Sequence, residues 1–214
     1  MGSPSREITG RGQDLLDLVD WRRRVGDLYR LEGPSALEEF RRGRDHLFRT
    51  HPQSPIEKPR EFAGLDYFPG DTAYRVRATF EPAAEASELV IDTGGEDGAI
   101  RYRRAGLLRF TLAGTECSLL VLSLIVYGGG LFVPFKDATS RSDTYGGGRY
   151  LFDTVKNTDG LVLELEPGSR EVTLDFNYAY NPSCAYNPRW ACPLAPPENV
   201  LPIPIRAGEK NFRT

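Results

Sequence analysis

The stretch "YRVRATF", residues 74 to 80, decides the fold that we expect for this chain. Apolar Tyr74, Val76, Ala78 and Phe80 alternate there with polar side chains, and this period of two is typical of a half-buried β-strand. Before residue 60 the apolar positions recur at helical spacing instead. The change of period predicts a helical segment followed by a β-domain.

Eight further segments share strand-like patterns or short apolar runs. Turn dipeptides such as Asp159-Gly160 and Pro167-Gly168 separate several of them, as in hairpins. The expected strands are 88–92, 99–104, 107–112, 117–127, 131–135, 149–155, 161–166 and 171–180. The predicted fold is therefore mainly β: an antiparallel meander that forms a barrel or two-sheet sandwich, preceded by two N-terminal α-helices.

Helical spacing of apolar residues predicts these two helices at about 13–30 and 35–50. His51-Pro52 and Ser54-Pro55 should end the second, because proline lacks an amide hydrogen and disfavours helix in the preceding residue. We expect a flexible tail at 1–11, a helical segment at 12–60 that packs on the β-domain, and the β-domain at 61–214, with a proline-rich lid at 181–204.

Charge and hydropathy argue against a nucleic-acid partner and against a membrane partner. The chain has 27 basic and 30 acidic residues among 214, without a block of like charge, so we expect no nucleic-acid partner. The longest apolar run, residues 118–127, is about half of the roughly 20 residues that a membrane-spanning helix needs. Without a signal-peptide pattern at the start, we expect a cytoplasmic protein with no membrane partner. Oligomeric state is left open.

Residues 135–152, "FKDATSRSDTYGGGRYLF", carry the first candidate site. Asp137 falls on the strand face occupied by Leu131, Val133 and Phe135, so its carboxylate points where apolar groups were and needs partners. Thr139, Thr144 and Tyr145 supply hydroxyl groups nearby, and a run of three glycines precedes Arg149. This pattern fits an anion-binding concavity, or a glycine-rich bend in which Arg149 pairs with an acid.

The last predicted strand, 171–180, adds polar groups. Thr173, Asp175, Asn177 and Asn181 occupy one face, opposite an apolar face. If this strand borders a barrel mouth, Asp175 and Asn177 could meet Asp137 and Arg149 in a polar site. Otherwise these groups are solvated surface.

The loop that follows, "NPSCAYNPRWACPLAPPEN" at 181–199, holds two of the three cysteines. Cys184 and Cys192 could form a disulfide or remain free thiols in a proline-stiffened lid. Their spacing is not one of the short thiolate spacings of zinc sites, and His46 and His51 do not share a helix face. We expect free thiols close enough to be oxidised, and neither a bound metal nor a cofactor.

Four segments resemble one family. "FKDAT", "DTYGGGRYL", "DFNYAYNPSCAYNPRWACPLAPPEN" and the terminal "IRAGEK" are similar, in order and spacing, to the bacterial and archaeal family called domain of unknown function 1684, in its short form. Arg141 and Ser183 depart from the pattern. The resemblance implies a mostly β domain over about 60–210 and no established activity. It also implies a shortlist of polar motif positions: Asp137, Thr139, Thr144, Tyr145, Arg149, Asp175, Asn177, Asn181, Tyr186 and Asn199.

Three functions stay open. The first is a binding module whose polar pocket, drawn from the shortlist without Asn199, holds a small anionic or hydroxyl-rich ligand. The second is a cofactor-independent hydrolase or isomerase in which Asp137 or Asp175 acts as general base. The third is a structural or regulatory interaction protein in which the motif only stabilises the fold. We expect Arg149 to bind at least one of the two aspartates, and this cluster to line the mouth of the main cavity beneath the lid.

Overall fold

Two helices open the chain, as predicted. The computed structural model describes residues 8–94, 98–158, 163–165 and 167–212. Helix α1 (Ile8–Tyr29) and helix α2 (Ala36–Thr50) match the expected helices, although α1 begins at Ile8 rather than near residue 13. The predicted tail therefore gives way to helix at residue 8, and residues 1–7 lie outside the described part.

The rest of the chain is an antiparallel sheet with short 3-10 turns. Its strands lie side by side in the order β6-β5-β4-β3-β1-β8-β7, and β2 pairs with β3 outside this path. Every described pair of these strands is antiparallel. The strands are β1 (Arg75–Pro82), β2 (Glu88–Asp92), β3 (Ala99–Leu112), β4 (Thr115–Leu124), β5 (Leu131–Phe135), β6 (Arg149–Asp153), β7 (Leu163–Leu165) and β8 (Glu171–Asp175). The mainly β fold class after two helices is confirmed.

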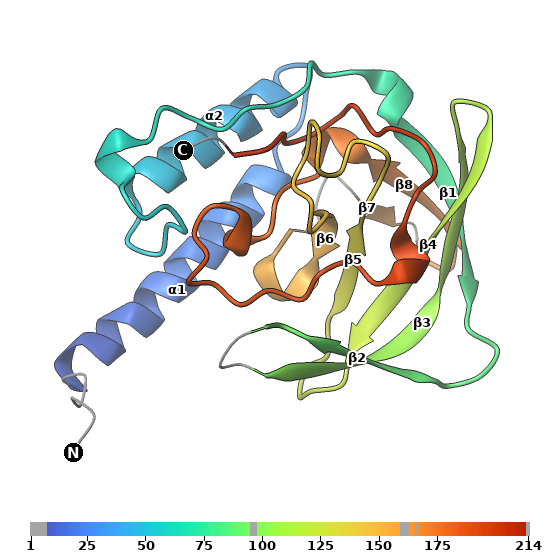
Figure 1. Cartoon of the computed structure of the whole chain (residues 1–214), viewed down its shortest axis with the longest axis horizontal. Helices are drawn as coiled ribbons and strands as arrows, with labels where there is room; N and C mark the ends of the chain where they lie inside the picture. Colours follow the sequence, from blue (N-terminus) through green and yellow to red (C-terminus); the bar gives the residue numbers. More distant parts are fainter. Residues whose placement is uncertain (1–7, 95–97, 159–162, 166, 213–214) are drawn as a thin grey trace.

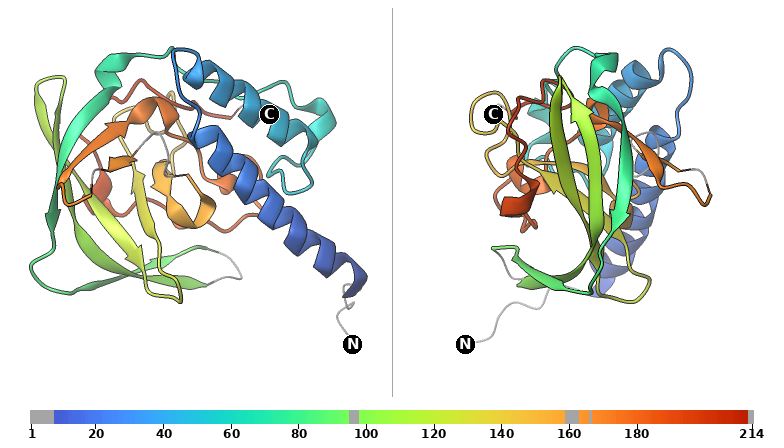
Figure 2. Two further views of the ribbon diagram at one scale, coloured as in Figure 1. Left: turned by 180° about the vertical axis from the view of Figure 1, so that it is seen from behind. Right: turned by 90° about the vertical axis from the view of Figure 1, so that its right-hand side faces the viewer.

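The sheet curls strongly into a half-barrel, with the two helices on one side (Figures 1 and 2). The long strand β3 is central to the curl, because β1, β2 and β4 all pair with it. A bulge between Arg104 and Gly106 joins the two strands that the sequence predicted at 99–104 and 107–112. A bulge bends a strand and increases its local twist, so the single strand β3 can pair with β2 near one end and with β1 near the other.

Two predicted strands end early for one shared reason. Strand β6 ends at Asp153 and β8 at Asp175, and each aspartate accepts a hydrogen bond from the backbone amide two residues later, Val155 and Asn177 respectively. This local bond starts a 3-10 turn in place of more strand. The strand face that we extended from Asp175 to Asn181 is therefore wrong beyond Asp175.

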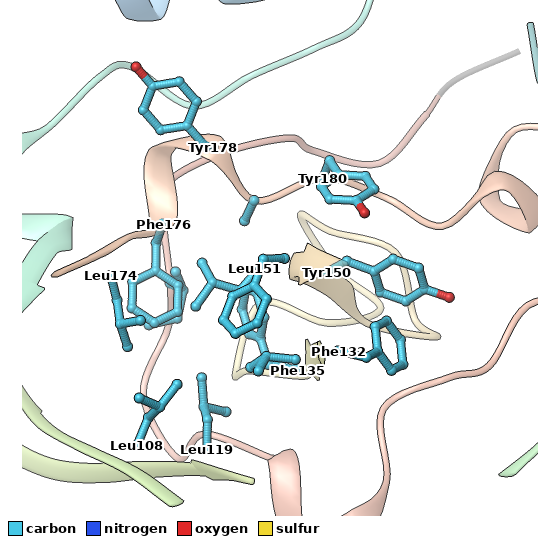
Figure 3. Close-up of a cluster of buried hydrophobic side chains, with 14 of the residues drawn as sticks. Leu108, Leu119, Phe132, Phe135, Tyr150, Leu151, Leu174, Phe176, Tyr178 and Tyr180 are labelled. Atoms are coloured by element: carbon cyan, nitrogen blue, oxygen red, sulfur yellow. The ribbon is translucent and has the colours of Figure 1, made fainter. Parts of the chain in front are cut away.

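Helices and sheet share one hydrophobic core. Leu108, Leu119, Phe135, Leu174 and Phe176 cluster inside the curled sheet (Figure 3). Farther along, the ring of Tyr178 packs edge-on against Phe40 of α2 with centroids 4.8 Å apart, and Phe40 packs edge-on against Tyr29 of α1. Each such buried side chain stabilises the fold by roughly 1.5–3 kcal/mol, so the helices are part of the folded unit that positions the site.

We name residues 181–204, the predicted lid, the strap; they run across strands β6, β5 and β4 in Figure 1. Asn199, fully buried, fastens the strap where β4 and β5 diverge. Its side chain accepts a hydrogen bond from the Leu120 amide at 2.7 Å and donates to the carbonyls of Leu120 at 3.0 Å and Pro134 at 2.7 Å. The role of Asn199 is therefore structural, because its side chain binds backbone groups of the two strands.

Candidate functional site

Arg149 and Asp137 form a buried ion pair. Nη2 of Arg149 donates to Oδ2 of Asp137 at 2.9 Å, and both side chains are only 1 % exposed. The same guanidinium also donates to the carbonyls of Ile205, Ala207 and Glu209. Burial lowers the pKa of Arg149, while Asp137 opposes that shift. The predicted bond to an aspartate is confirmed, but the pair is enclosed, so the expectation that it lines an open cavity mouth is corrected.

The Asp137 carboxylate is buried and bound by donors from three residues. Its Oδ1 accepts from the amides of Thr139 and Ile205 and from the Thr139 hydroxyl, and its Oδ2 accepts from Nη2 of Arg149. Thr144 completes the group, because its hydroxyl lies 2.9 Å from that of Thr139. Asp137, Thr139, Thr144 and Arg149 together fasten strand β6 to the C-terminal residues 205–209.

Asp175 belongs to a separate cluster. Its Oδ2 pairs with Nη1 of Arg75 at 3.3 Å, and its Oδ1 accepts from the amide and side chain of Asn177. The Asn177 side chain in turn exchanges hydrogen bonds with the backbone of Asp71. Strand pairing explains the choice of partner, since Arg75 and Asp175 face each other in register between β1 and β8. The polar site that was expected to unite Asp175 with Arg149 therefore does not form.

A third buried cluster surrounds Glu209. Its carboxylate accepts hydrogen bonds from Nη2 of Arg44 at 3.0 Å, from the Tyr186 hydroxyl, and from the Asn181 amide and side chain. Burial raises the pKa of Glu209, and the Arg44 charge and these hydrogen bonds oppose that rise. Asn181 and Tyr186 were on the sequence shortlist, whereas Arg44 and Glu209 were missed. Glu209 lies within the quoted "IRAGEK" segment, the one signal that could have found it.

Asn181 has an unpaired oxygen beside a small cavity. Its side-chain nitrogen donates to Glu209 and to the Lys210 carbonyl at 2.7 Å, yet its Oδ1 has no hydrogen-bond partner although the residue is only 2 % exposed. The adjacent cavity has a volume of about 50 Å³, and Arg44, Tyr180 and Tyr186 also line it. We name it the inner cavity. Because a buried polar atom without a partner is unfavourable, this oxygen needs a donor from a water molecule or a ligand.

A second cavity adjoins the first, with a volume of about 190 Å³. The two share Trp21, Pro55, Lys156 and Ser183 in their walls, and we name the larger one the outer pocket. It lies between α1, the loop after α2 and the strap, and its wall is completed by Leu18, Arg22, Gln53, Trp190, Ala191 and Cys192.

Two residues in the wall of the outer pocket carry buried donors without a partner. The buried Nε of Arg22 and Nε1 of Trp190 have no hydrogen-bond partner within the described part of the chain. Its charged wall residues, Arg22 and Lys156, are both basic. Lys156 has one acidic neighbour, Asp153, at 3.5 Å. Donors and positive charge together suit an anion.

The half-barrel itself holds a different kind of cavity. Its volume is about 280 Å³, and apolar side chains from six strands line it together with Ser169: Phe80, Leu108, Val121, Leu131, Phe152 and Val172. None of the shortlisted polar residues is among them. The shortlisted polar residues therefore lie away from the cavity of the half-barrel.

Tyr145 and the two strap cysteines form the remaining polar group. The Tyr145 hydroxyl lies 3.7 Å from Sγ of Cys184, and the Cys184 amide donates to Sγ of Cys192 at 3.4 Å. All three cysteines are free.

Among described residues, no three His, Cys, Asp or Glu side chains gather as a metal site would require. No described helix has the length and apolar character to cross a membrane.

Comparison with known proteins gives a family and a related structure. No curated protein matches the chain. The solution NMR structure of an uncharacterised protein from Haloarcula marismortui matches with a TM-score of 0.58 and 36 % identity, over 82 % of this chain and 92 % of that one. The family model described as a protein of unknown function, DUF1684, matches residues 60–210. The chain therefore belongs to the DUF1684 family, as the sequence motifs predicted.

Proposed function

We propose that this protein binds a small anionic molecule, carrying a hydroxyl or ammonium group, in the outer pocket and inner cavity. The observation that carries the proposal is the unpaired Oδ1 of Asn181 beside the inner cavity. A ligand hydroxyl or ammonium would supply the donor that this oxygen lacks. The anionic group would lie in the outer pocket, near Arg22, Lys156 and Trp190.

The size of the two cavities favours a small ligand. Together they provide room for a few non-hydrogen atoms in the inner part and a larger group in the outer part. Of the shortlisted residues, Asn181 and Tyr186 line this site. We assign the others to fold stability, because they belong to the buried clusters around Asp137 and Asp175 or lie beside the thiols.

The geometry gives less support to an enzyme with an aspartate base. Asp137 is enclosed, with four donors on its carboxylate, and Asp175 is held by Arg75 and Asn177. A general base needs a lone pair within reach of the substrate proton. Ligand binding in a cytoplasmic protein, where reducing conditions would keep the thiols free, is the better-supported function.

Thermal unfolding with a panel of small anions tests the proposal. We would use inorganic phosphate, lactate, glycerol phosphate and a small amino acid, at rising concentration. A ligand at 100 times its Kd stabilises by about 2.7 kcal/mol, which for a chain of this size raises the Tm by roughly 5–10 °C. At least one compound should do so.

Variants then locate the binding. Trp190→Phe removes the indole N–H donor and keeps an aromatic ring, and Arg22→Gln removes the charge. Each should weaken the titrated affinity at least about tenfold, the loss of one charged or buried hydrogen bond. Arg101→Gln is the matched control, because Arg101 is an exposed arginine on β3, paired with Glu88. Equal affinity in all three variants would refute this site.

A further inference from the structure

The strap brings two cysteines into contact at the wall of the outer pocket. The backbone N–H of Cys184 donates to Sγ of Cys192 at 3.4 Å, although seven residues lie between them in sequence. A 3-10 turn, η5 (Ser183–Ala185), holds Cys184. Next to Cys192, the Pro193 carbonyl accepts a hydrogen bond from the Tyr150 hydroxyl at 2.6 Å. Both thiols are thus positioned by the fold.

The two thiols differ in environment. Cys192, which is 5 % exposed, forms part of the pocket wall together with Arg22, Lys156 and Trp190. Cys184 is the more exposed of the two and lies next to the Tyr145 hydroxyl. A reactive thiol open to a pocket with a second thiol beside it is the arrangement typical of redox-sensing cysteines.

The pKa values of the two thiols are shifted in opposite directions. A hydrogen bond from the Cys184 side chain lowers the pKa of Cys192, against the effect of burial, and the Cys184 amide and the Lys156 charge act in the same direction. The same hydrogen bond, with burial, raises the pKa of Cys184. The thiolate is the nucleophilic form of cysteine, and Cys192 is also the thiol that lines the outer pocket.

We propose that Cys192 and Cys184 are a redox-active pair, in which Cys192 reacts with a hydroperoxide in the outer pocket and Cys184 then closes a disulfide. In the first step the Cys192 thiolate attacks the distal peroxide oxygen, the O–O bond breaks, and the departing alkoxide takes a proton to leave as an alcohol, or as water from hydrogen peroxide. Cys192 becomes a sulfenic acid, oxidised by two electrons.

In the second step Cys184 attacks the sulfenic sulfur, the S–O bond breaks, and water leaves with the Cys184 proton. The product is the disulfide, and an external dithiol would return both cysteines to thiols by exchange. This inference goes beyond the proposed function and does not depend on a bound anion.

The test is oxidation of the reduced full chain by hydrogen peroxide at pH 7, followed by alkylation and peptide mass spectrometry. Free cysteine, with a pKa of about 8.5, is only about 3 % thiolate at that pH. Cys192 should therefore react at least about tenfold faster than free cysteine and than Cys117, a thiol buried in strand β4 whose pKa is raised by burial. The product should be the Cys184–Cys192 disulfide.

Variants assign the order of the steps. In Cys184→Ser, dimedone should trap a sulfenic acid on Cys192, and in Cys192→Ser, Cys184 should stay reduced. A Cys192 that reacts no faster than Cys117 or free cysteine, or dimedone labelling at Cys184 instead, would overturn the proposal. Arg101→Gln, at the exposed arginine on β3, is the control and should form the disulfide at the wild-type rate.

Discussion

The carboxylate of Glu209 accepts a hydrogen bond from Nη2 of Arg44 at 3.0 Å, with both side chains at most 5 % exposed. This bond joins helix α2 to the C-terminal segment, 165 residues away. The backbone carbonyl of Glu209 also accepts a hydrogen bond from Nη1 of Arg149. One residue therefore connects the buried ion pair under strand β6 with the wall of the proposed ligand site.

Removal of Arg44 should destabilise the protein in a pH-dependent way. In Arg44→Met, Glu209 stays buried without its cation, which costs about 3–5 kcal/mol when the carboxylate is ionised. The pKa of Glu209, already raised by burial, should rise further. Below the unfolded pKa the group is protonated in both states, and stability is lost as pH rises through the folded pKa. Urea unfolding should therefore show a smaller loss relative to wild type at pH 5 than at pH 8.

The double variant Arg44→Met/Glu209→Gln provides the check on that cause. Without a carboxylate to ionise, it should recover part of the stability at pH 8 and show no pH difference beyond that of wild type. A single variant whose loss is the same at pH 5 and pH 8 would contradict the assignment to Glu209.

Removal of Arg149 should cost far more than removal of an arginine in an exposed pair of equal length. Arg206 pairs with Asp143 at 2.9 Å, the distance between Arg149 and Asp137, but with side chains 61 % and 40 % exposed. Arg149→Met leaves a buried carboxylate uncompensated, at about 3–5 kcal/mol, whereas Arg206→Met should cost less than about 1 kcal/mol. Unfolding in urea measures both. Similar losses would mean that Asp137 finds other compensation.

The sequence predicted contacts that depend on local pattern. Alternation along strand β5 placed Asp137 on the inward face, and the structure shows it buried and bound to Arg149, 12 residues away. The helix pair follows from the change of period, and the pairing of β3 with β4 and of β7 with β8 follows from turn dipeptides, because short connections make neighbouring antiparallel strands. The sheet is not the sequential meander that the sequence predicted, since β1 pairs with β3 and β8.

Contacts that depend on the pairing of distant segments could not be predicted from the sequence. Arg75 meets Asp175 because β1 pairs with β8, and no local pattern specifies that register. Asp175 also ends its strand through a bond to its own backbone neighbour, which the apolar alternation to residue 180 concealed. The outer pocket arises where α1 approaches the strap, so its residues come from segments that no local sequence pattern brings together.

Loss of the Asn199 side chain should release the strap from the sheet. Asn199→Ala leaves the amide and carbonyl of Leu120 and the Pro134 carbonyl without these partners. Each unsatisfied buried group costs about 1–3 kcal/mol, so the loss should be at least about 2 kcal/mol. Hydrogen exchange by mass spectrometry should show faster exchange at the Leu120 amide. Asn211→Ala, which removes one exposed side-chain bond to the Ser142 carbonyl, is the control and should change neither quantity.

Gly208 should tolerate alanine much less than Gly114, although both have a left-handed backbone, with φ of 73° and 75°. A Cβ at Gly208 would lie 2.6 Å from the Ala179 carbonyl oxygen and 2.7 Å from that of Phe176, whereas one at Gly114 meets no heavy atom of the described residues within 4 Å. Gly114→Ala should cost only the left-handed strain, about 1–2 kcal/mol. Gly208→Ala adds the displacement of backbone, about 1–3 kcal/mol more. Because this displacement moves Glu209 away from Arg44, the variant should also weaken any anion binding in the pocket. Equal stability of the two variants would show that residues 205–209 can shift without loss.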